Sequence, residues 1–363
     1  MRAVLMRDRR LTVEQVLDPV PREGEVLVEV LACGICGTDL HCARHGPEFN
    51  RAVATARGVG LLDLERPVVL GHEFVGRIVA HGPGTTGRIP LGRRVVSAPA
   101  LTRPAGTLLG FATPETPGGY AERMVLSESL LLEVPDHLPT EQAALTEPLA
   151  VAFHAVARAE MGPDDVPLVI GCGPIGLAII AVLRMRGSGP IVAVEPSAPR
   201  RALAEALGAD VVLDPARESP YRAWADLAAR GAPRNGPGTG AVRGPKPRPT
   251  VAFECVGTPG VIQQIVAGSP PRTRIVVAGL CMTTDGFEPA QAVLKELELR
   301  FAMMYSPAEF ARTFTHLTTG DFDVAPLVTR TVSLDEVPAV FAALSESPED
   351  AKVLIVPTSR AAP

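Results

Sequence analysis

Three residues that stand far apart in the chain, Cys36, His72 and Glu147, carry side chains that zinc accepts together. A thiolate, an imidazole and a carboxylate, with a fourth position left open, define a catalytic zinc site rather than a structural one. Each residue alone also fits a simpler interpretation, as a small buried thiol, a hydrogen-bonded strand histidine or a solvated helix residue. The wide separation means that no local spacing rule decides between these interpretations.

Polar neighbours favour the metal site over the simpler interpretations. A hydroxyl, a carboxylate, an imidazole and a second carboxylate stand beside Cys36 and His72; they come from Thr38, Asp39, His41 and Glu73. Such groups can orient a metal ligand, hydrogen-bond an alcohol oxygen and transfer a proton. The residues as a set therefore indicate alcohol chemistry at a metal.

A glycine-rich turn predicts a second site, for a dinucleotide. An apolar run, 168–170, leads into Gly171, Gly173 and Gly176 in the pattern G-x-G-x-x-G, and helical sequence follows. The glycines permit a tight turn, close approach to a pyrophosphate and close packing of helix on strand. Glu195 ends the next apolar strand, where a carboxylate can hold ribose hydroxyls. A plain glycine-rich loop is the alternative, and the strand, helix and acid together favour the dinucleotide site.

Two kinds of secondary structure must position these residues. Short strands broken by Pro and Gly occupy the first part of the chain and predict an antiparallel β module. From residue 168, apolar strands alternate with helical segments, which predicts a doubly wound parallel sheet. The polar stretch 46–67 is expected to be irregular, and the Gly- and Pro-rich stretch 231–250 is expected to be a surface loop.

Composition narrows the class of protein. The 363 residues are 46% hydrophobic and 21% charged, which is ordinary for a two-domain α/β enzyme. A net charge of −5 without a basic cluster argues against nucleic acid as a partner. The apolar runs are too short to span a membrane, and the first residues do not resemble a signal peptide. We therefore expect a cytoplasmic location, in which the six cysteines are thiols.

Five motifs occur in an order that resembles the medium-chain, zinc-dependent alcohol and polyol dehydrogenases. They are GICGTDLH (34–41), GHEFVG (71–76), GGYAE (118–122), TEPLAVAFHA (146–155) and GCGPIG (171–176). The sorbitol and threonine dehydrogenase type is nearer, because Glu147 stands where the horse-liver type has a cysteine. The resemblance implies a GroES-like β domain (1–150 and 304–363) that carries the metal, a Rossmann domain (151–303), and an active site in the cleft.

The resemblance also implies roles for the polar residues. Zinc would be bound by three ligands, with Glu73 able to enter or leave the coordination shell; the ligands are Cys36, His72 and Glu147. Asp39 would orient the ligand histidine. Thr38 would hydrogen-bond the substrate oxygen and His41 would pass the proton outward through the cofactor ribose, although an N-cap and a surface histidine remain the alternatives. Zinc would polarise the alcohol, and hydride would pass to the nicotinamide.

Cofactor recognition is expected to involve further residues of the second domain. The segment Ala278, Gly279 and Leu280 matches the family segment that lines the nicotinamide pocket, and Ile175 offers backbone to the pyrophosphate. The carboxylate of Glu195 would repel a 2′-phosphate, which favours NAD over NADP. Arg200 and Arg201 argue modestly for NADP, yet NAD-using polyol dehydrogenases similarly place an arginine at the position of Arg200.

Several features separate this chain from its relatives or leave alternatives open. The stretch 97–118 lacks the four cysteines that hold a structural zinc in many relatives, so we expect one zinc. The resemblance implies a small secondary alcohol or polyol as the substrate, and a homo-dimer or homo-tetramer that forms through an edge strand at 296–301. Four large apolar residues have two alternative interpretations, as the lining of an apolar substrate pocket or as ordinary core: Phe111, Phe153, Met282 and Met304. The alternative functions are a zinc-free NADPH quinone or enoyl reductase and a non-catalytic dinucleotide-binding protein.

Overall fold

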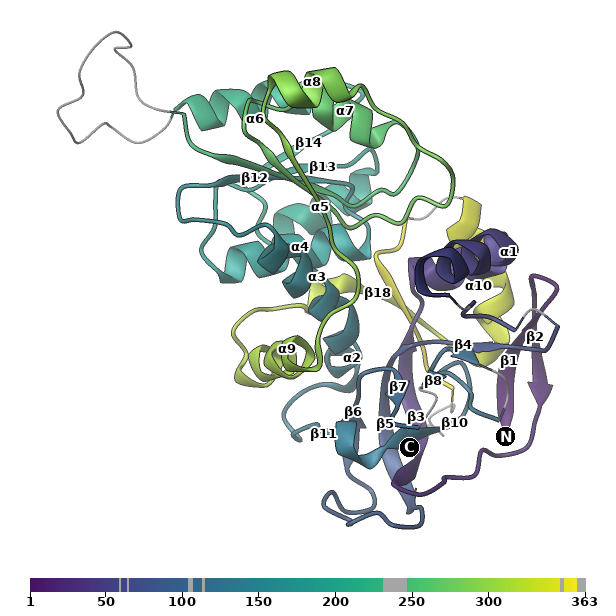
Figure 1. Cartoon of the computed structure of the whole chain (residues 1–363). Helices are drawn as coiled ribbons and strands as arrows, with labels where there is room; N and C mark the ends of the chain where they lie inside the picture. Colours follow the sequence, from purple (N-terminus) through teal and green to yellow (C-terminus); the bar gives the residue numbers. More distant parts are fainter. Residues whose placement is uncertain are drawn as a thin grey trace, which may run out of the picture. The chain divides into compact units, whose positions relative to one another are not determined.

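The structure is a computed structural model that describes residues 1–58, 60–63, 65–103, 107–112, 115–230, 247–346 and 349–357. It divides into two compact units (Figure 1). Unit 1 comprises Met1–Pro148, Ser306–Asp321 and Val328–Pro363, and unit 2 comprises Leu149–Tyr305 and Phe322–Leu327. Most of the predicted surface loop 231–250 lies outside the described residues.

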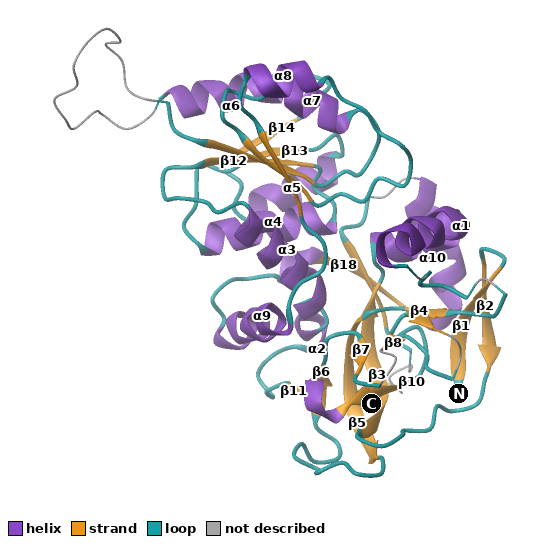
Figure 2. Ribbon diagram, viewed as in Figure 1, coloured by secondary structure: helices purple, strands orange, loops and turns teal. Residues whose placement is uncertain are grey.

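Unit 1 is built on a mainly antiparallel sheet, shown in orange in Figure 2. Its strand order is β11-β6-β5-β3-β19-β18, and β10 also pairs with β3. The strands are β3 (Glu25–Gly34), β5 (Glu73–His81), β6 (Arg94–Val96), β10 (Arg123–Ser127), β11 (Leu132–Glu133), β18 (Val328–Val332) and β19 (Lys352–Ile355). The alternation of apolar and polar residues in 25–32 predicts such a half-buried strand, and β3 lies in the interior of the sheet.

Three small sheets and several helices also belong to unit 1. Three two-stranded sheets pair β1 (Arg2–Arg7) with β2 (Arg10–Gln15), β4 (Val69–Leu70) with β9 (Phe111–Ala112), and β7 (Ala100–Leu101) with β8 (Thr107–Leu108). The helices are α1 (Gly37–Arg57), α2 (Thr140–Ala143), α9 (Pro307–Thr319) and α10 (Val337–Glu346), with 3-10 turns η1 (Glu128–Leu130) and η3 (Leu334–Glu336).

Helix α1 corrects the expectation of an irregular stretch 46–67 for residues 46–57, whereas the described residues of 58–67 lie in no helix or strand. The helix continues to Arg57, bends at His45 (φ −129°, ψ 33°) and contains Pro47. Proline lacks the N–H that a helix interior needs, and the chain accommodates it next to this kink. Alanines in the following turns favour the helical backbone, and Gly58 ends it with φ +80°.

Unit 2 contains the predicted parallel sheet. Its order is β14-β13-β12-β15-β16-β17, the doubly wound order in which sequence runs outward from β12 in both directions. The strands are β12 (Val166–Ile170), β13 (Val192–Val194), β14 (Val211–Leu213), β15 (Thr250–Glu254), β16 (Arg274–Val277) and β17 (Glu298–Phe301). The helices are α4 (Pro174–Met185), α5 (Ala198–Ala206), α6 (Pro220–Ala229), α7 (Val261–Gly268) and α8 (Pro289–Leu294), with the turn η2 (Ala325–Leu327).

Helix α3 (Thr146–Arg158) begins in unit 1 and continues into unit 2. Pro148 therefore falls in the first helical turn, where its missing N–H has no partner to lose. This placement puts Glu147 beside the helix N-terminus. No helix of the described chain has both the length and the apolar character needed to span a membrane.

Candidate metal centre

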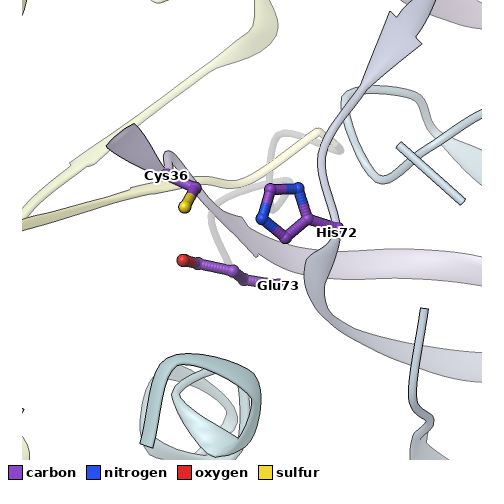
Figure 3. Close-up of side chains that lie close together, drawn as sticks. All are labelled: Cys36, His72 and Glu73. Atoms are coloured by element: carbon purple, nitrogen blue, oxygen red, sulfur yellow. The ribbon is translucent and has the colours of Figure 1, made fainter. Parts of the chain in front are cut away.

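Strand pairing in unit 1 brings the predicted ligands Cys36 and His72 to the same end of the sheet. Gly34, the last residue of β3, pairs with Glu73, the first residue of β5. Cys36 stands two residues after the end of β3, at the N-cap of α1, and His72 directly precedes β5. Figure 3 shows the side chains of Cys36, His72 and Glu73 directed toward one another.

The three side chains form a compact group of metal-binding atoms. One ligand atom from each of Cys36, His72 and Glu73 lies within 4.8 Å of the other two. His72 is 7% exposed and Glu73 is fully buried. Among the residues that the structure describes, this group does not include Glu147, which we had expected as the third ligand; Glu147 is half-buried at the second position of α3.

Asp39 lies where it can orient His72. It occupies the first turn of α1, is fully buried, and accepts a hydrogen bond from the Cys36 backbone N–H at 3.0 Å. Its Oδ1 lies 3.4 Å from Nδ1 of His72. Burial opposes charge on the imidazole, but the negative charges of Asp39 and Cys36 outweigh burial and hold the pKa of His72 well above its usual value. With Nδ1 facing Asp39, Nε2 remains for a metal.

Phe111 packs against the same histidine. Its ring stacks on the His72 ring with a centroid distance of 5.2 Å, and Phe49 of α1 lies on Phe111 at 6.4 Å. Phe111 is buried. This residue therefore combines both interpretations offered by the sequence, because it belongs to the core and also forms one wall beside a predicted ligand.

Lys352 is a site residue that sequence reasoning missed. Its ammonium group donates to both carboxylate oxygens of Glu73, at 2.8 and 2.7 Å, and to the Ile35 carbonyl at 3.0 Å. Both side chains are buried, and β19 brings the lysine here by pairing with β3. Burial disfavours the ammonium, but the charges of Glu73, Cys36 and Glu147 raise the pKa of Lys352. The one sequence feature that could have indicated this role is the presence of a lysine within the apolar run 351–356.

Thr38 lies in the first turn of α1 and His41 in the second, and both are half-buried. The ring of His41 lies 6.5 Å from the ring of His45. Burial, followed by the neighbouring charges of His45 and Arg44, lowers the pKa of His41. A histidine that is neutral near neutral pH can accept a proton, which is what the predicted relay requires.

The glycine turn of unit 2 has the conformation that its pattern predicts. Gly171 has φ +88°, and a Cβ on Gly176 would lie 1.9 Å from the Gly171 carbonyl oxygen. Gly173 precedes α4, whose first turn includes Ile175. The helix N-terminus thus presents its N–H groups at a turn in which Gly171 and Gly176 leave no room for a side chain, and this arrangement suits a pyrophosphate.

Glu195 and Arg200 lie beside this turn. The buried carboxylate of Glu195 accepts the Cys172 N–H at 2.8 Å and the Ser197 N–H at 2.9 Å. Nη1 of Arg200 lies 4.0 Å from the position of a Cβ on Gly173. Arg201 is engaged elsewhere, with the carbonyls of Glu195 and Pro196 and with Asp214.

The predicted nicotinamide segment follows β16. The backbone N–H groups of Ala278 and Gly279 donate to the Glu254 carbonyl, both at 2.9 Å, and a Cβ on Gly257 would lie 2.7 Å from the Leu280 nitrogen. Residues 278–280 are therefore fixed against the loop that follows β15. Parallel strands β15 and β16 end together here, at the edge where such sheets bind ligands.

The donor set in unit 1 suits zinc. A thiolate, an imidazole nitrogen and carboxylates are the ligand types that zinc prefers, and an oriented Nδ1 leaves Nε2 as donor. Oδ1 of Asp39 and Nδ1 of His72 are buried without a conventional hydrogen bond and face each other. Binding of a cation at Nε2 would strengthen that contact, because it makes the Nδ1–H a better donor.

Comparison with known proteins identifies the family. The family described as "Alcohol dehydrogenase GroES-like domain" matches residues 22–136, and the family described as "Zinc-binding dehydrogenase" matches residues 174–319. An (R,R)-butanediol dehydrogenase of Bacillus subtilis is 32% identical over 96% of each chain. The chain belongs to the medium-chain, zinc-dependent alcohol and polyol dehydrogenases. This family membership confirms the predicted combination of a GroES-like domain and a Rossmann domain.

Other members of the family show how wide the resemblance is. Sorbitol dehydrogenase of Rattus norvegicus is 27% identical over 89% of this chain and 87% of its own. The crystal structure of 2R,3R-butanediol dehydrogenase from Bacillus subtilis has a TM-score of 0.80, with 29% identity over 98% of this chain and 99% of that chain. As a medium-chain dehydrogenase, the chain is an oxidoreductase that acts on an alcohol with a nicotinamide cofactor. The two alternative functions gain no support.

Proposed function

We propose that this dehydrogenase oxidises a secondary hydroxyl of a small vicinal diol or polyol to a ketone, with NAD as the acceptor and one catalytic zinc. The observation that carries the proposal is the group of Cys36, His72 and Glu73, with Asp39 facing the histidine. Similarity to a butanediol dehydrogenase and a sorbitol dehydrogenase supports a substrate with more than one hydroxyl.

The protein's own residues would prepare the metal centre. Cys36, His72 and Glu147 would hold zinc, and the zinc, when bound, would act as a Lewis acid that lowers the pKa of the substrate hydroxyl. Asp39 would fix the tautomer of His72 so that Nε2 is the donor. The ammonium group of Lys352 would stabilise the negative charge of Glu73, so that this carboxylate can remain ionised although it is buried close to the ligands.

Substrate orientation and proton removal would fall to α1 and its surroundings. We propose that the Thr38 hydroxyl accepts a hydrogen bond from the substrate alcohol and that His41 acts as the acceptor of the proton that the alcohol releases. The lowered pKa of His41 suits an acceptor that must be neutral before it takes the proton. Phe111 and Phe49 would keep water from the inner side of His72.

The surroundings of the glycine turn support NAD as the cofactor. The carboxylate of Glu195 is buried at the end of β13, and a negative charge there would repel the 2′-phosphate of NADP. Arg201, the second arginine that could recognise such a phosphate, is bonded to two backbone carbonyls and Asp214. Arg200 remains near the turn, where it can face the adenosine or the pyrophosphate.

Replacing Glu195 by glutamine tests the cofactor assignment. The amide keeps one acceptor for the Cys172 and Ser197 N–H groups but removes the charge that repels a 2′-phosphate. We expect KM for NAD to rise about tenfold and the preference for NAD over NADP, measured as the ratio of kcat/KM, to fall by at least that factor. Glu205→Gln, which makes the same change on α5, the helix that follows Glu195, is the control. An unchanged preference would contradict the assignment.

The proposed function is tested by initial rates of NADH formation with a panel of alcohols. The panel contains the stereoisomers of 2,3-butanediol, sorbitol and a monohydric secondary alcohol of similar size. We expect the diol or polyol to give the highest kcat/KM, a chelator to abolish turnover, and added zinc to restore it. Turnover of quinones with NADPH that resists the chelator would instead support a zinc-free reductase.

We also propose that the chain forms homo-oligomers through the edge of the parallel sheet. Strand β17 is the last strand of that sheet, and large apolar side chains near it are exposed: Val293, Leu294, Phe301 and Met303. An edge strand with exposed apolar residues is a natural surface for association. Light scattering on Phe301→Asp is expected to report a smaller assembly than the wild type, and an unchanged mass would contradict this interface.

A further inference from the structure

Tyr120, in the motif GGYAE, contacts the residue that orients His72. Its side chain is fully buried, and its hydroxyl donates a hydrogen bond of 2.6 Å to Oδ2 of Asp39. The residue stands just before β10, far in sequence from α1. The sequence motif singled it out as part of a family pattern but assigned it no task.

The hydrogen bonds on Asp39 divide between its two oxygens. Oδ2 accepts from the Tyr120 hydroxyl and from the Cys36 backbone N–H, at 2.6 and 3.0 Å. Oδ1 has no such donor and lies 3.4 Å from Nδ1 of His72. A carboxylate whose one oxygen holds two donors cannot rotate without losing both, so its other oxygen stays aimed at the imidazole.

The tyrosine ring is itself held on several sides. A Cβ on Gly71, which has φ +100°, would lie 2.5 Å from Cδ1 of the ring, so the backbone next to His72, between β4 and β5, packs directly on it. Phe341 of α10 meets the ring edge to face at 5.9 Å. The hydroxyl oxygen also lies 3.5 Å from the Gly34 carbonyl, at the end of β3. These contacts therefore fix the position of the Tyr120 hydroxyl.

The chemistry of the hydroxyl suits a permanent donor. Burial, reinforced by the negative charge of Asp39, raises the pKa of Tyr120 well above its usual value, so the phenol keeps its proton throughout the working pH range. A hydrogen bond to a buried carboxylate is charge-assisted and stronger than one between neutral groups. A tyrosine that only filled the core could have satisfied its hydroxyl with a backbone carbonyl.

We infer that Tyr120 is a positioning residue for the proposed metal centre: its hydroxyl fixes Asp39, Asp39 orients His72, and zinc retention depends on this chain of contacts. The inference rests on the proposed zinc site. It predicts that the loss of one hydroxyl, which touches neither metal nor substrate, weakens the hold on the metal. Residues beyond the ligands typically change metal affinity by about 10- to 100-fold.

The test compares zinc release from the holoenzyme of Tyr120→Phe with that of the wild type, followed with a chromogenic chelator in excess. Tyr221→Phe, which makes the same change on α6 of unit 2, is the control. We expect Tyr120→Phe to release zinc about tenfold faster, and Tyr221→Phe to match the wild type. The cobalt-substituted variant should show a shifted d–d absorption band. The phenylalanine ring keeps the apolar contacts, and the Tm of each metal-free protein verifies the fold.

A double-mutant cycle separates positioning from general stability. In an Asp39→Asn background, Tyr120→Phe is expected to change the release rate less than about twofold, because the coupling passes through the carboxylate. Equal effects in both backgrounds, or release from Tyr120→Phe at the wild-type rate, would overturn the inference. Wild-type protein that binds no zinc would instead overturn the proposed function, so the two failures are distinguishable.

Discussion

Replacing Lys352 by methionine is expected to lower the free energy of unfolding by about 3–5 kcal/mol. The lysine is 2% exposed and its ammonium bonds to both oxygens of Glu73, which is itself fully buried. Methionine fills most of the space but leaves the carboxylate charged, buried and without its partner. Urea denaturation of the metal-free protein measures the loss directly, provided that both proteins unfold in one transition.

Two further variants make the Lys352 prediction specific. Lys295→Met removes a lysine whose ammonium donates hydrogen bonds to the carbonyls of Val266 and Ala267 in unit 2, and should cost less than about 1.5 kcal/mol. Adding Glu73→Gln to Lys352→Met removes the buried, unpaired negative charge of the carboxylate, and most of the lost free energy of unfolding should return. A double variant as unstable as Lys352→Met alone would show that the lysine acts through packing and not through Glu73.

Cys36→Ala is expected to lower kcat/KM at least a thousandfold while NAD still binds. The thiolate is one of the proposed zinc ligands, and a Lewis acid contributes several kcal/mol to such a reaction. NAD binding should persist because the glycine turn and Glu195 belong to the other unit. The measurements are the rate of NADH formation and the quenching of protein fluorescence on addition of cofactor.

Cys42→Ala is the matched control for Cys36→Ala. Cys42 lies on α1 only six residues away and is buried, but it is not part of the group formed by Cys36, His72 and Glu73. It should keep zinc and most of its activity. Full turnover by a zinc-free Cys36→Ala protein would contradict the assignment of this residue.

Local patterns were enough to predict the nucleotide-binding unit. The apolar strand, the glycine pattern and the acidic residue lie within 30 residues, so sequence neighbours are also spatial neighbours. Gly171 and Gly176 accordingly lie in a tight turn, and Glu195, directly after β13, accepts a hydrogen bond from the Cys172 N–H of that turn. The strand order of the sheet follows from the alternation of strands and helices.

The metal centre was harder to predict because it depends on long-range strand pairing. The pairing of Gly34 with Glu73, and of Leu354 with Gly34, brings together residues from both ends of the chain. No local pattern marks Lys352 as the partner of Glu73, or Tyr120 as the donor to Asp39. In 46–57 the polar composition predicted irregular structure, and the helical tendency of the alanines outweighed it.

The most direct test of the account is the zinc content of the purified wild-type protein and of Cys36→Ala, measured by elemental analysis beside NADH formation with 2,3-butanediol. The account predicts about one zinc per wild-type chain, loss of zinc and turnover in the variant, and loss of turnover in the wild type after chelation. Wild-type protein that contains no zinc and still turns over the diol would contradict it.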